Sequence, residues 1–345
     1  MENKKNVKYH RICFVAGKSG GHILPCITLA QQMLNKHPQY EVMFFSTATA
    51  LDKQLVNSSA IIRHYIPLTL QAFPHKSIVR YPKFLWHLVS SFVTSFYYLY
   101  KLKPEGVIST GGHISIPVCL AARLLKIPIE LYELNVIPGK AIKFLAPFAY
   151  KIWICFEQST SYFPGNRCTL TNYPMKFTDY KKLSREDALA TIQFSPQRKT
   201  VVILGGSQGS LFINAAMRQT LENFPQLAQN IQIIHQTGAY DTTDWQSFYA
   251  SMDLPALVFS YSDELATYYA AADIVMCRSG AGTLAEVSFF DKPCITIPLE
   301  TATTKHQVDN AVAAAQTRPD LFTIVKQEDI DQDRKTLHNA ITSLL

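Results

Sequence analysis

Glycine-rich turns are the parts of this sequence whose residue types and spacing could do chemistry. Three of them lie between an apolar run and a helical pattern, at 17–22 (GKSGGH), 110–113 (TGGH) and 205–209 (GGSQG). A fourth, at 278–283 (RSGAGT), has the same context. Glycine allows left-handed dihedrals and close backbone approach, and a helix start presents N–H groups and a positive dipole end. Each turn could therefore hold a phosphate, although any single one could also be a tight turn that binds nothing.

His22 is the candidate general base. It lies in the first turn of an expected helix at 21–34. The helix dipole there would lower the pKa of the ring and keep it neutral, as a general base requires. An isolated histidine can also be purely structural, so the context of the first glycine turn is what favours a catalytic role.

Other polar side chains occur beside the expected ends of strands. Glu286 lies one turn inside the helix opened by the fourth glycine turn, where a carboxylate can accept hydrogen bonds from ribose hydroxyls. Glu133 and Asn135 follow an expected strand at 129–132, and Gln307 begins a later helix. The structural alternatives are a solvated helix face for Glu286, turn formation for Asn135 and ordinary polarity at a helix start for Gln307.

Short β-branched runs alternate with helical stretches along the chain, for example at 12–16 and 201–204. This alternation predicts parallel strands joined by crossover helices. The pattern restarts after a turn-rich stretch at 161–176. We therefore expect an α/β protein with two doubly wound, Rossmann-like parallel-sheet domains, residues 1–170 and 171–345.

The four turns would then share one kind of location. Open α/β sheets bind ligands at the carboxyl ends of their strands, and each turn follows a strand. The Walker pattern is absent, and the first turn is not Gly-x-Gly-x-x-Gly. ATP hydrolysis and nicotinamide binding are both disfavoured.

Composition and charge fit a globular protein with more than one core. The chain has 345 residues, more than a single core usually supports. It is 48% hydrophobic and 17% charged, unlike a disordered chain. The net charge of +7, from 33 basic and 26 acidic residues, fits an anionic ligand or membrane surface and is also ordinary for this size.

The cysteines and the start of the chain indicate the compartment. The seven cysteines are widely spaced with no Cys-x-x-Cys pair, which predicts buried free thiols in a reducing environment. Residues 1–9 are polar and lead directly into the strand at 11–16, with no apolar signal segment. We expect the protein to stay in the cytoplasm.

Six ordered motifs together resemble the MurG family, UDP-N-acetylglucosamine-dependent transferases of peptidoglycan synthesis. The motifs are 17–25 (GKSGGHILP), 111–117 (GGHISIP), 133–139 (ELNVIPG), 205–209 (GGSQG), 278–286 (RSGAGTLAE) and 306–311 (HQVDNA). The resemblance implies a GT-B fold whose two domains face a cleft. It assigns a lipid-linked acceptor to the N-terminal domain and UDP-N-acetylglucosamine to the C-terminal domain.

The resemblance also implies a reaction and its residues. The reaction is transfer of N-acetylglucosamine to undecaprenyl-linked N-acetylmuramyl-pentapeptide. Our hypothesis for its mechanism is direct displacement with inversion by the acceptor's 4-hydroxyl, with His22 as base, aided by Glu133. His113 falls on the acceptor side, where a tyrosine is usual, and Lys176 stands where the family has an arginine. The implied donor-binding residues are Ser19, Gly20, Gly21, Asn135, Lys176, Ser207, Ser262, Ala281, Gly282, Thr283, Leu284, Ala285, Glu286 and Gln307.

The expected partners follow from this reaction. They are a UDP-sugar donor and an undecaprenyl-linked acceptor, and no nucleic acid is expected. No Asp-x-Asp sequence follows a strand, so we expect no metal, and no cofactor beyond the donor substrate.

The stretch 84–100 (FLWHLVSSFVTSFYYLY) is the candidate membrane element. It is short for a span and is interrupted by His87 and by serines and threonines. Lysines and an arginine flank it, so a helix lying on an anionic membrane surface fits better. The alternative is a crossover helix buried on the sheet. The family resemblance favours peripheral docking on the cytoplasmic face of the bacterial inner membrane.

Two other functions also fit the sequence. One is a related glycolipid-forming glycosyltransferase of the same architecture. The other is an inactive, membrane-docked UDP-sugar-binding protein, suggested by the departures at positions such as His113. A UDP-N-acetylglucosamine epimerase shares the twin-sheet architecture, but the aromatic helix would have no purpose there.

Overall fold

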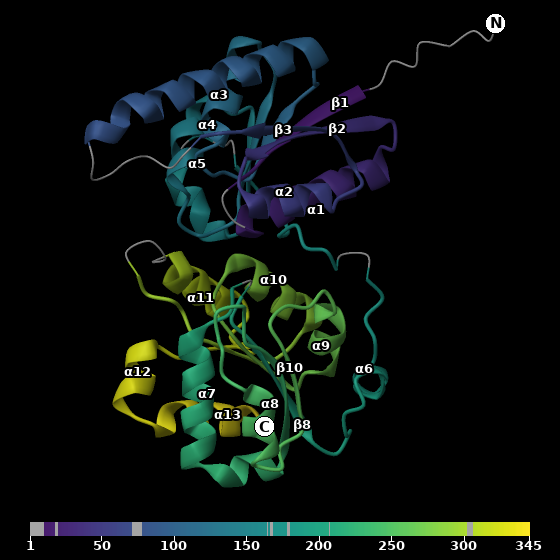
Figure 1. Cartoon of the computed structure of the whole chain (residues 1–345), viewed down its shortest axis with the longest axis vertical. Helices are drawn as coiled ribbons and strands as arrows, with labels where there is room; N and C mark the ends of the chain where they lie inside the picture. Colours follow the sequence, from purple (N-terminus) through teal and green to yellow (C-terminus); the bar gives the residue numbers. More distant parts are fainter. Residues whose placement is uncertain are drawn as a thin grey trace, which may run out of the picture. The chain divides into compact units, whose positions relative to one another are not determined.

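The computed structural model describes residues 10–17, 20–70, 78–163, 165, 168–177, 180–206, 208–301 and 306–345. The chain forms two compact units, Met1–Pro174 and Met175–Leu345. Each unit is built on its own sheet, and all strand pairings in the described residues are parallel (Figure 1). The expected fold class is confirmed, and the boundary between the units lies four residues after the one drawn from the sequence.

The N-terminal unit contains a sheet with strand order β3-β2-β1-β4-β5-β6-β7. Its strands are β1 (His10–Val15), β2 (Tyr40–Thr47), β3 (Ile62–Leu68), β4 (Val107–Ser109), β5 (Ile129–Glu133), β6 (Lys151–Ile154) and β7 (Cys168–Leu170). Its helices are α1 (Gly20–Lys36), α2 (Ala50–Asn57), α3 (Tyr81–Leu102), α4 (Ser115–Leu124) and α5 (Lys140–Leu145), with short 3₁₀ turns η1 (Ile78–Arg80), η2 (Ala146–Phe148) and η3 (Glu157–Tyr162).

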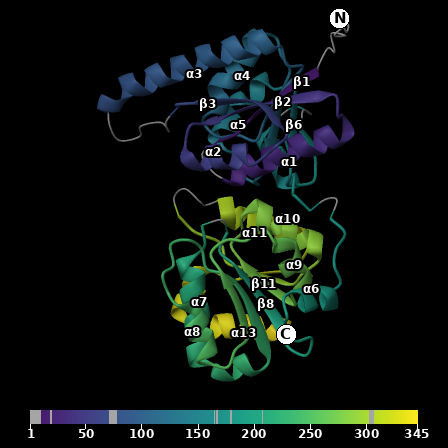
Figure 2. The same ribbon diagram turned by 45° about the vertical axis from the view of Figure 1, so that its right-hand side comes forward.

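Both faces of the sheet are buried around β1 and β2, which is why these strands contain apolar runs without alternation. Successive residues of β1 point to opposite faces: Phe14 packs in the core under α1 and α2, and Val15 in the core under α3, α4 and α5. Figures 1 and 2 show these two groups of helices on opposite sides of the sheet. The unit is doubly wound, as predicted.

The C-terminal unit repeats this plan with strand order β10-β9-β8-β11-β12-β13. Its strands are β8 (Lys199–Leu204), β9 (Ile231–Gln236), β10 (Ala256–Phe259), β11 (Ile274–Cys277), β12 (Cys294–Thr296) and β13 (Phe322–Ile324). Its helices are α6 (Arg185–Thr191), α7 (Leu211–Asn223), α8 (Trp245–Ala250), α9 (Leu265–Ala271), α10 (Ala281–Phe290), α11 (His306–Thr317), α12 (Gln327–Gln332) and α13 (Lys335–Leu344), with the 3₁₀ turn η4 (Pro225–Gln229). Figure 2 shows α7, α8 and α13 on one flank of this sheet and α6, α9 and α10 on the other.

Each sheet has one point where the strand order reverses. In the first sheet the chain builds outward from β1 through β2 to β3, then returns to place β4 on the other side of β1. The second sheet reverses in the same way between β8 and β11. Loops leaving the two strands at such a switch point diverge and leave a crevice, which is where open α/β sheets bind ligands. The first two glycine turns follow β1 and β4, and the last two follow β8 and β11.

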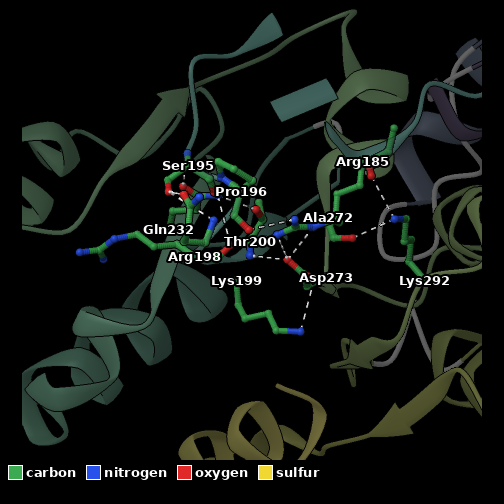
Figure 3. Close-up of polar contacts among 12 residues, drawn as sticks. Arg185, Ser195, Pro196, Arg198, Lys199, Thr200, Gln232, Ala272, Asp273 and Lys292 are labelled. Carbon is green, nitrogen blue, oxygen red and sulfur yellow. Dashed lines mark hydrogen bonds and ion pairs between the residues drawn. The ribbon is translucent and has the colours of Figure 1, made fainter. Parts of the chain in front are cut away.

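A dense polar network at the amino ends of the strands of the second sheet, away from the glycine turns, has a structural role (Figure 3). The carboxylate of Asp273, just before β11, accepts from Arg185 Nη2 at 2.7 Å and from the backbone N–H of Thr200 at 2.8 Å. Gln232 of β9 donates to Thr200 Oγ1 at 2.9 Å and to the Ser195 carbonyl at 2.8 Å. These contacts fasten α6 and the segment before β8 to the amino ends of the strands.

Candidate active site

The first two glycine turns lie against each other at the switch point of the N-terminal sheet. A Cβ on Gly112 would lie 3.1 Å from the carbonyl oxygen of Gly17, and Gly112 has a φ of +84°. Both the close approach and the left-handed backbone require glycine there. Gly20 and Gly21 begin α1 immediately beyond, whereas Ser19 lies outside the described residues.

Reciprocal hydrogen bonds join His22 to Thr110 of the second turn. Nδ1 of His22 lies 2.9 Å from the Thr110 carbonyl oxygen, and Thr110 Oγ1 donates to the His22 carbonyl at 2.8 Å. A carbonyl oxygen can only accept, so Nδ1 carries the proton. In the neutral ring Nε2 is then the basic nitrogen. The fold therefore sets the tautomer that a base acting through Nε2 needs, on a partly exposed side chain.

Glu133 organises the loop that follows β5. It is buried, and burial raises the pKa of its carboxyl to about 7. Oε1 accepts from the backbone N–H of Asn135 at 2.8 Å, and Oε2 accepts from that of Gly139 at 2.9 Å. Because both oxygens are engaged by the loop, this geometry supports a positioning role for Glu133; its help in proton removal stays a prediction. Asn135 is held on this loop, and its carbonyl accepts from Ser159 Oγ at 3.0 Å.

His113 lies just before α4 and is partly buried. Its Nε2 is 3.1 Å from the carbonyl oxygen of Leu70, so this nitrogen is the donor. The bond ties the second turn to the segment that follows β3. A role for His113 on the acceptor side stays a prediction.

The third glycine turn packs against the loop after β9. A Cβ on Gly209 would overlap the carbonyl of Thr237, and a Cβ on Gly238 would overlap the backbone of Gly209. Both glycines also have left-handed backbones, with φ of +79° and +88°. The shape of the turn is therefore fixed by close backbone contacts with the loop after β9. Ser207, at its centre, lies outside the described residues.

Arg278 ties the third and fourth turns together, a role that the sequence did not reveal. Its Nε donates to Oγ of Ser210, the N-cap residue of α7, at 3.0 Å. Its Nη1 donates to the Ile297 carbonyl at 3.1 Å and to Gln327 Oε1 at 2.6 Å. Burial lowers the pKa of the guanidinium to about 10, which leaves it charged at neutral pH. The sequence feature that could have indicated this role is the position of Arg278 at the start of the RSGAGT motif.

The fourth turn opens α10 without a side-chain cap. Gly280, the N-cap residue, has an extended backbone (φ −66°, ψ 137°) and no side chain to accept from the first N–H groups. A Cβ on Gly280 would meet no atom within 4 Å among the described residues. Such a helix start can receive an anion. Of the implied donor-binding residues here, Ala281 and Leu284 are buried, whereas Gly282, Thr283, Ala285 and Glu286 are partly exposed.

Glu286 faces two groups that stabilise its charge. Its Oε2 accepts from the hydroxyl of Tyr269 at 2.9 Å, and Lys176 acts on it electrostatically. Burial outweighs both and raises the pKa of the carboxyl to about 7. Lys176 itself is exposed and lies 3.5 Å from the carboxylate of Asp263. The structure thus brings Lys176 and Glu286, 110 positions apart in the sequence, into one electrostatic environment.

Ser262 and Gln307 take part in local hydrogen bonds of the same unit. Ser262 Oγ accepts from the backbone N–H of Glu264 at 3.0 Å and donates to the Tyr268 hydroxyl at 3.3 Å. Gln307, in the first turn of α11, accepts from the backbone N–H of Leu299 at 3.0 Å through Oε1. Their contacts with a donor stay predictions.

Helix α3 carries a second surface feature. Its inner side packs toward the sheet through residues such as Leu99, which is buried. Its outer side forms what we term the α3 apolar face: Leu85, Trp86, Val89, Val93, Phe96, Tyr97 and Tyr100, all exposed. Within the described residues, no helix has the length and apolar character needed to cross a bilayer. The crossover interpretation of 84–100 is confirmed in that one side of α3 packs on the core, although the helix is not fully buried. Docking on a membrane stays a prediction.

Two doubly wound parallel sheets with paired glycine turns at their switch points are the architecture of GT-B-type, two-domain glycosyltransferases. Residues 12–154 match the Glycosyltransferase family 28 N-terminal domain, and residues 200–345 match the Glycosyltransferase family 28 C-terminal domain. The chain belongs to glycosyltransferase family 28, and the resemblance to its MurG members that the motifs carried is confirmed.

Curated relatives and a solved structure support this placement. The chain is 32% identical over 303 residues to the UDP-N-acetylglucosamine--N-acetylmuramyl-(pentapeptide) pyrophosphoryl-undecaprenol N-acetylglucosamine transferase of Myxococcus xanthus, covering 88% of this chain and 77% of the relative. It is also 32% identical over 324 residues to the transferase of the same name from Geobacter metallireducens, covering 92% and 86%. The fold is similar to the crystal structure of Acinetobacter baumannii MurG, with a TM-score of 0.74, 23% identity and 97% and 90% of the two chains covered.

Proposed function

We propose that this chain transfers N-acetylglucosamine from UDP-N-acetylglucosamine to the 4-hydroxyl of an undecaprenyl-linked N-acetylmuramyl-pentapeptide, with inversion at the sugar carbon. The names that its relatives carry support the substrates. The observation that carries the chemistry is the bond between His22 Nδ1 and the Thr110 carbonyl, because it leaves Nε2 as the basic nitrogen.

The donor would be bound by the C-terminal unit. The uncapped start of α10 and the turn after β8 present backbone N–H groups to the diphosphate. Lys176 would add a positive charge, and Glu286 would accept from the ribose hydroxyls. Ser207, Ser262 and Gln307 would complete the contacts with the nucleotide. Negative charge that develops on the leaving UDP is then stabilised by helix N–H groups and Lys176, and we propose no role for a metal.

The acceptor would be activated by the N-terminal unit. Its sugar 4-hydroxyl attacks C1 of N-acetylglucosamine, and the new C–O bond forms as the bond from C1 to the phosphate oxygen breaks. The hydroxyl proton passes to Nε2 of His22, and UDP leaves with the bonding electron pair. The opposed directions of attack and departure invert the configuration at C1. Glu133 would serve by holding the loop of Asn135 in place.

The α3 apolar face would dock on the membrane that carries the acceptor. Trp86 is 72% exposed on this face, and aromatic rings favour the interface between headgroups and acyl chains. Lys83 precedes the face, and Lys101 and Lys103 end it, so anionic headgroups would be attracted at both ends. This supports a peripheral position at the cytoplasmic face of the inner membrane.

A transfer assay tests the proposal directly. Radiolabelled UDP-N-acetylglucosamine is incubated with the chain and a lipid-linked muramyl-pentapeptide, with and without a chelator. We expect product in both conditions and a loss of about 10²–10⁴-fold in kcat for His22→Ala. The exposed His37→Ala serves as the matched histidine control. Near-normal turnover of His22→Ala would remove the base assignment, and product only on other glycolipid acceptors would replace the proposed acceptor.

A further inference from the structure

A buried aromatic cluster lies behind Glu286, and Tyr269 of α9 is at its centre. The Tyr269 ring stacks on Phe290, with centroids 5.2 Å apart and an interplanar angle of 18°. It meets Phe177 edge to face at 6.4 Å. Tyr269 is only 1% exposed, so its ring has one well-defined position.

Two of these rings, Phe290 and Phe177, belong to the segments that carry the charges of the proposed donor site. Phe290 lies one helical turn after Glu286 on α10, and Phe177 directly follows Lys176. The Tyr269 ring therefore packs against both the helix of the carboxylate and the segment of the lysine.

The Tyr269 hydroxyl adds a directed contact to this packing. It donates to Glu286 Oε2 at 2.9 Å. Burial and the nearby Glu286 carboxylate raise the pKa of the phenol, which stays protonated and hence a permanent donor. Within the described residues no hydrogen bond to Glu286 Oε1 occurs, so one oxygen is held from the interior while the other can serve as an acceptor.

We propose that Tyr269 is the positioning residue that sets the Glu286 carboxylate for recognition of the ribose hydroxyls, and that it thereby determines the preference for a ribonucleotide donor. This inference rests on the proposed function, because it assumes that Glu286 contacts the donor ribose. Tyr269 acts only through Glu286. Nothing in its own surroundings reaches a ligand, since its ring is enclosed by Phe177 and Phe290.

A ligand-based thermodynamic cycle tests the assignment. Binding of UDP and of 2′,3′-dideoxy-UDP to the full chain is measured by calorimetry for wild type and Tyr269→Phe. At a pH above 7, where the Glu286 carboxyl is charged, the wild type should prefer UDP by roughly 10- to 100-fold. In Tyr269→Phe the preference should fall to within about threefold, with most of the loss in UDP affinity and little in dideoxy-UDP affinity. The donor KM should rise with a smaller change in kcat.

Two further variants separate the possible outcomes. Glu286→Gln should lose the preference as Tyr269→Phe does. Tyr249→Phe should keep it: Tyr249 is fully buried in the other core of this unit, and its hydroxyl is bonded to His235 Nδ1 at 2.8 Å. A wild type that binds neither ligand would overturn the proposed function itself. Loss in Glu286→Gln with full preference retained in Tyr269→Phe would overturn the inference alone.

A packing variant covers the case in which Tyr269→Phe fails to fold. Phe290→Leu leaves the hydroxyl of Tyr269 in place but removes the ring stacked on it. We expect a partial loss of the preference for UDP, smaller than that of Glu286→Gln. An unchanged preference in Phe290→Leu would contradict the view that the enclosed ring fixes the carboxylate.

Discussion

Arg278 and Ser210 are joined by a hydrogen bond of 3.0 Å that spans the switch point of the C-terminal sheet. The bond connects the first residue of the fourth glycine turn to the N-cap of the helix after the third. Ser210 Oγ also accepts from the backbone N–H of Ile213 at 3.3 Å, so it caps α7 while it receives the guanidinium. The relative position of the two turns is therefore set by the buried guanidinium of Arg278, which needs no contact with the nucleotide sugar to do so.

Replacing Arg278 should loosen both turns together. In Arg278→Lys the ammonium keeps the charge but cannot reach Ser210, Ile297 and Gln327 in the same geometry. We expect a loss of about 2–4 kcal/mol in the free energy of unfolding and a raised donor KM. Urea unfolding and steady-state kinetics measure the two effects. Arg218→Lys, at an exposed pair with Glu222, should change neither, and equal effects at both positions would argue against a special role for Arg278.

Gly209 of the third turn should tolerate no side chain. Gly209→Ala places a methyl group against the Thr237 carbonyl in a left-handed backbone, so we expect destabilisation of about 2–4 kcal/mol. Gly139→Ala is the matched control, because a Cβ there meets nothing within 4 Å and the backbone φ is −60°. Thermal unfolding should separate the two variants clearly. Equal midpoints would show that the turn can rearrange.

The sequence predicted the turns and their strands because these signals are local. Glycine spacing and β-branched runs need only neighbouring residues to be recognised. The tautomer of His22 could not be predicted, since it depends on a carbonyl 88 residues away. The contact between Tyr269 and Glu286 and that between Arg278 and Ser210 join different elements for the same reason.

Helix α3 shows a different limit of the sequence pattern. The stripe of Phe84, Leu88 and Phe92 packs on the core, and the stripe of Leu85, Val89 and Val93 is exposed, yet both are apolar with the same spacing. Hydrophobic periodicity predicted the helix but could not tell which side faces the sheet. That choice follows from the strands on which the helix packs.

The buried Glu133 should make stability depend on pH with a definite sign. Its folded-state pKa of about 7 exceeds the ordinary value of 4.5, so the folded chain binds more protons than the unfolded chain between these values. Its contribution therefore weakens the fold as pH rises from about 4.5 to 7, by on the order of 3 kcal/mol, and is constant above that.

Comparison with Glu133→Gln isolates this contribution. The variant should be less stable near pH 5, because its amide cannot accept from both loop N–H groups, but its stability should fall less between pH 5 and 7. The comparison is needed because the lowered pKa of His235, about 4, acts in the opposite direction in both proteins. Urea unfolding at several pH values gives the slopes, and parallel curves for the two proteins would contradict the assigned pKa.

The α3 apolar face should govern binding to anionic membranes without affecting the fold. Val93→Asp places a charge at the middle of the face, where it must remain in water, so we expect binding to phosphatidylglycerol vesicles to fall by about tenfold or more. Tyr150→Asp is the control, because Tyr150 is 75% exposed on the same unit but lies outside α3. Vesicle sedimentation measures the binding, and transfer to a detergent-solubilised acceptor should stay unchanged in both variants.

The salt dependence of binding separates the aromatic rings of the face from the flanking lysines. Raising the salt concentration should weaken wild-type binding only in part, because the rings inserted among the lipids still contribute. Complete release by salt would mean that the flanking lysines alone hold the protein at the surface.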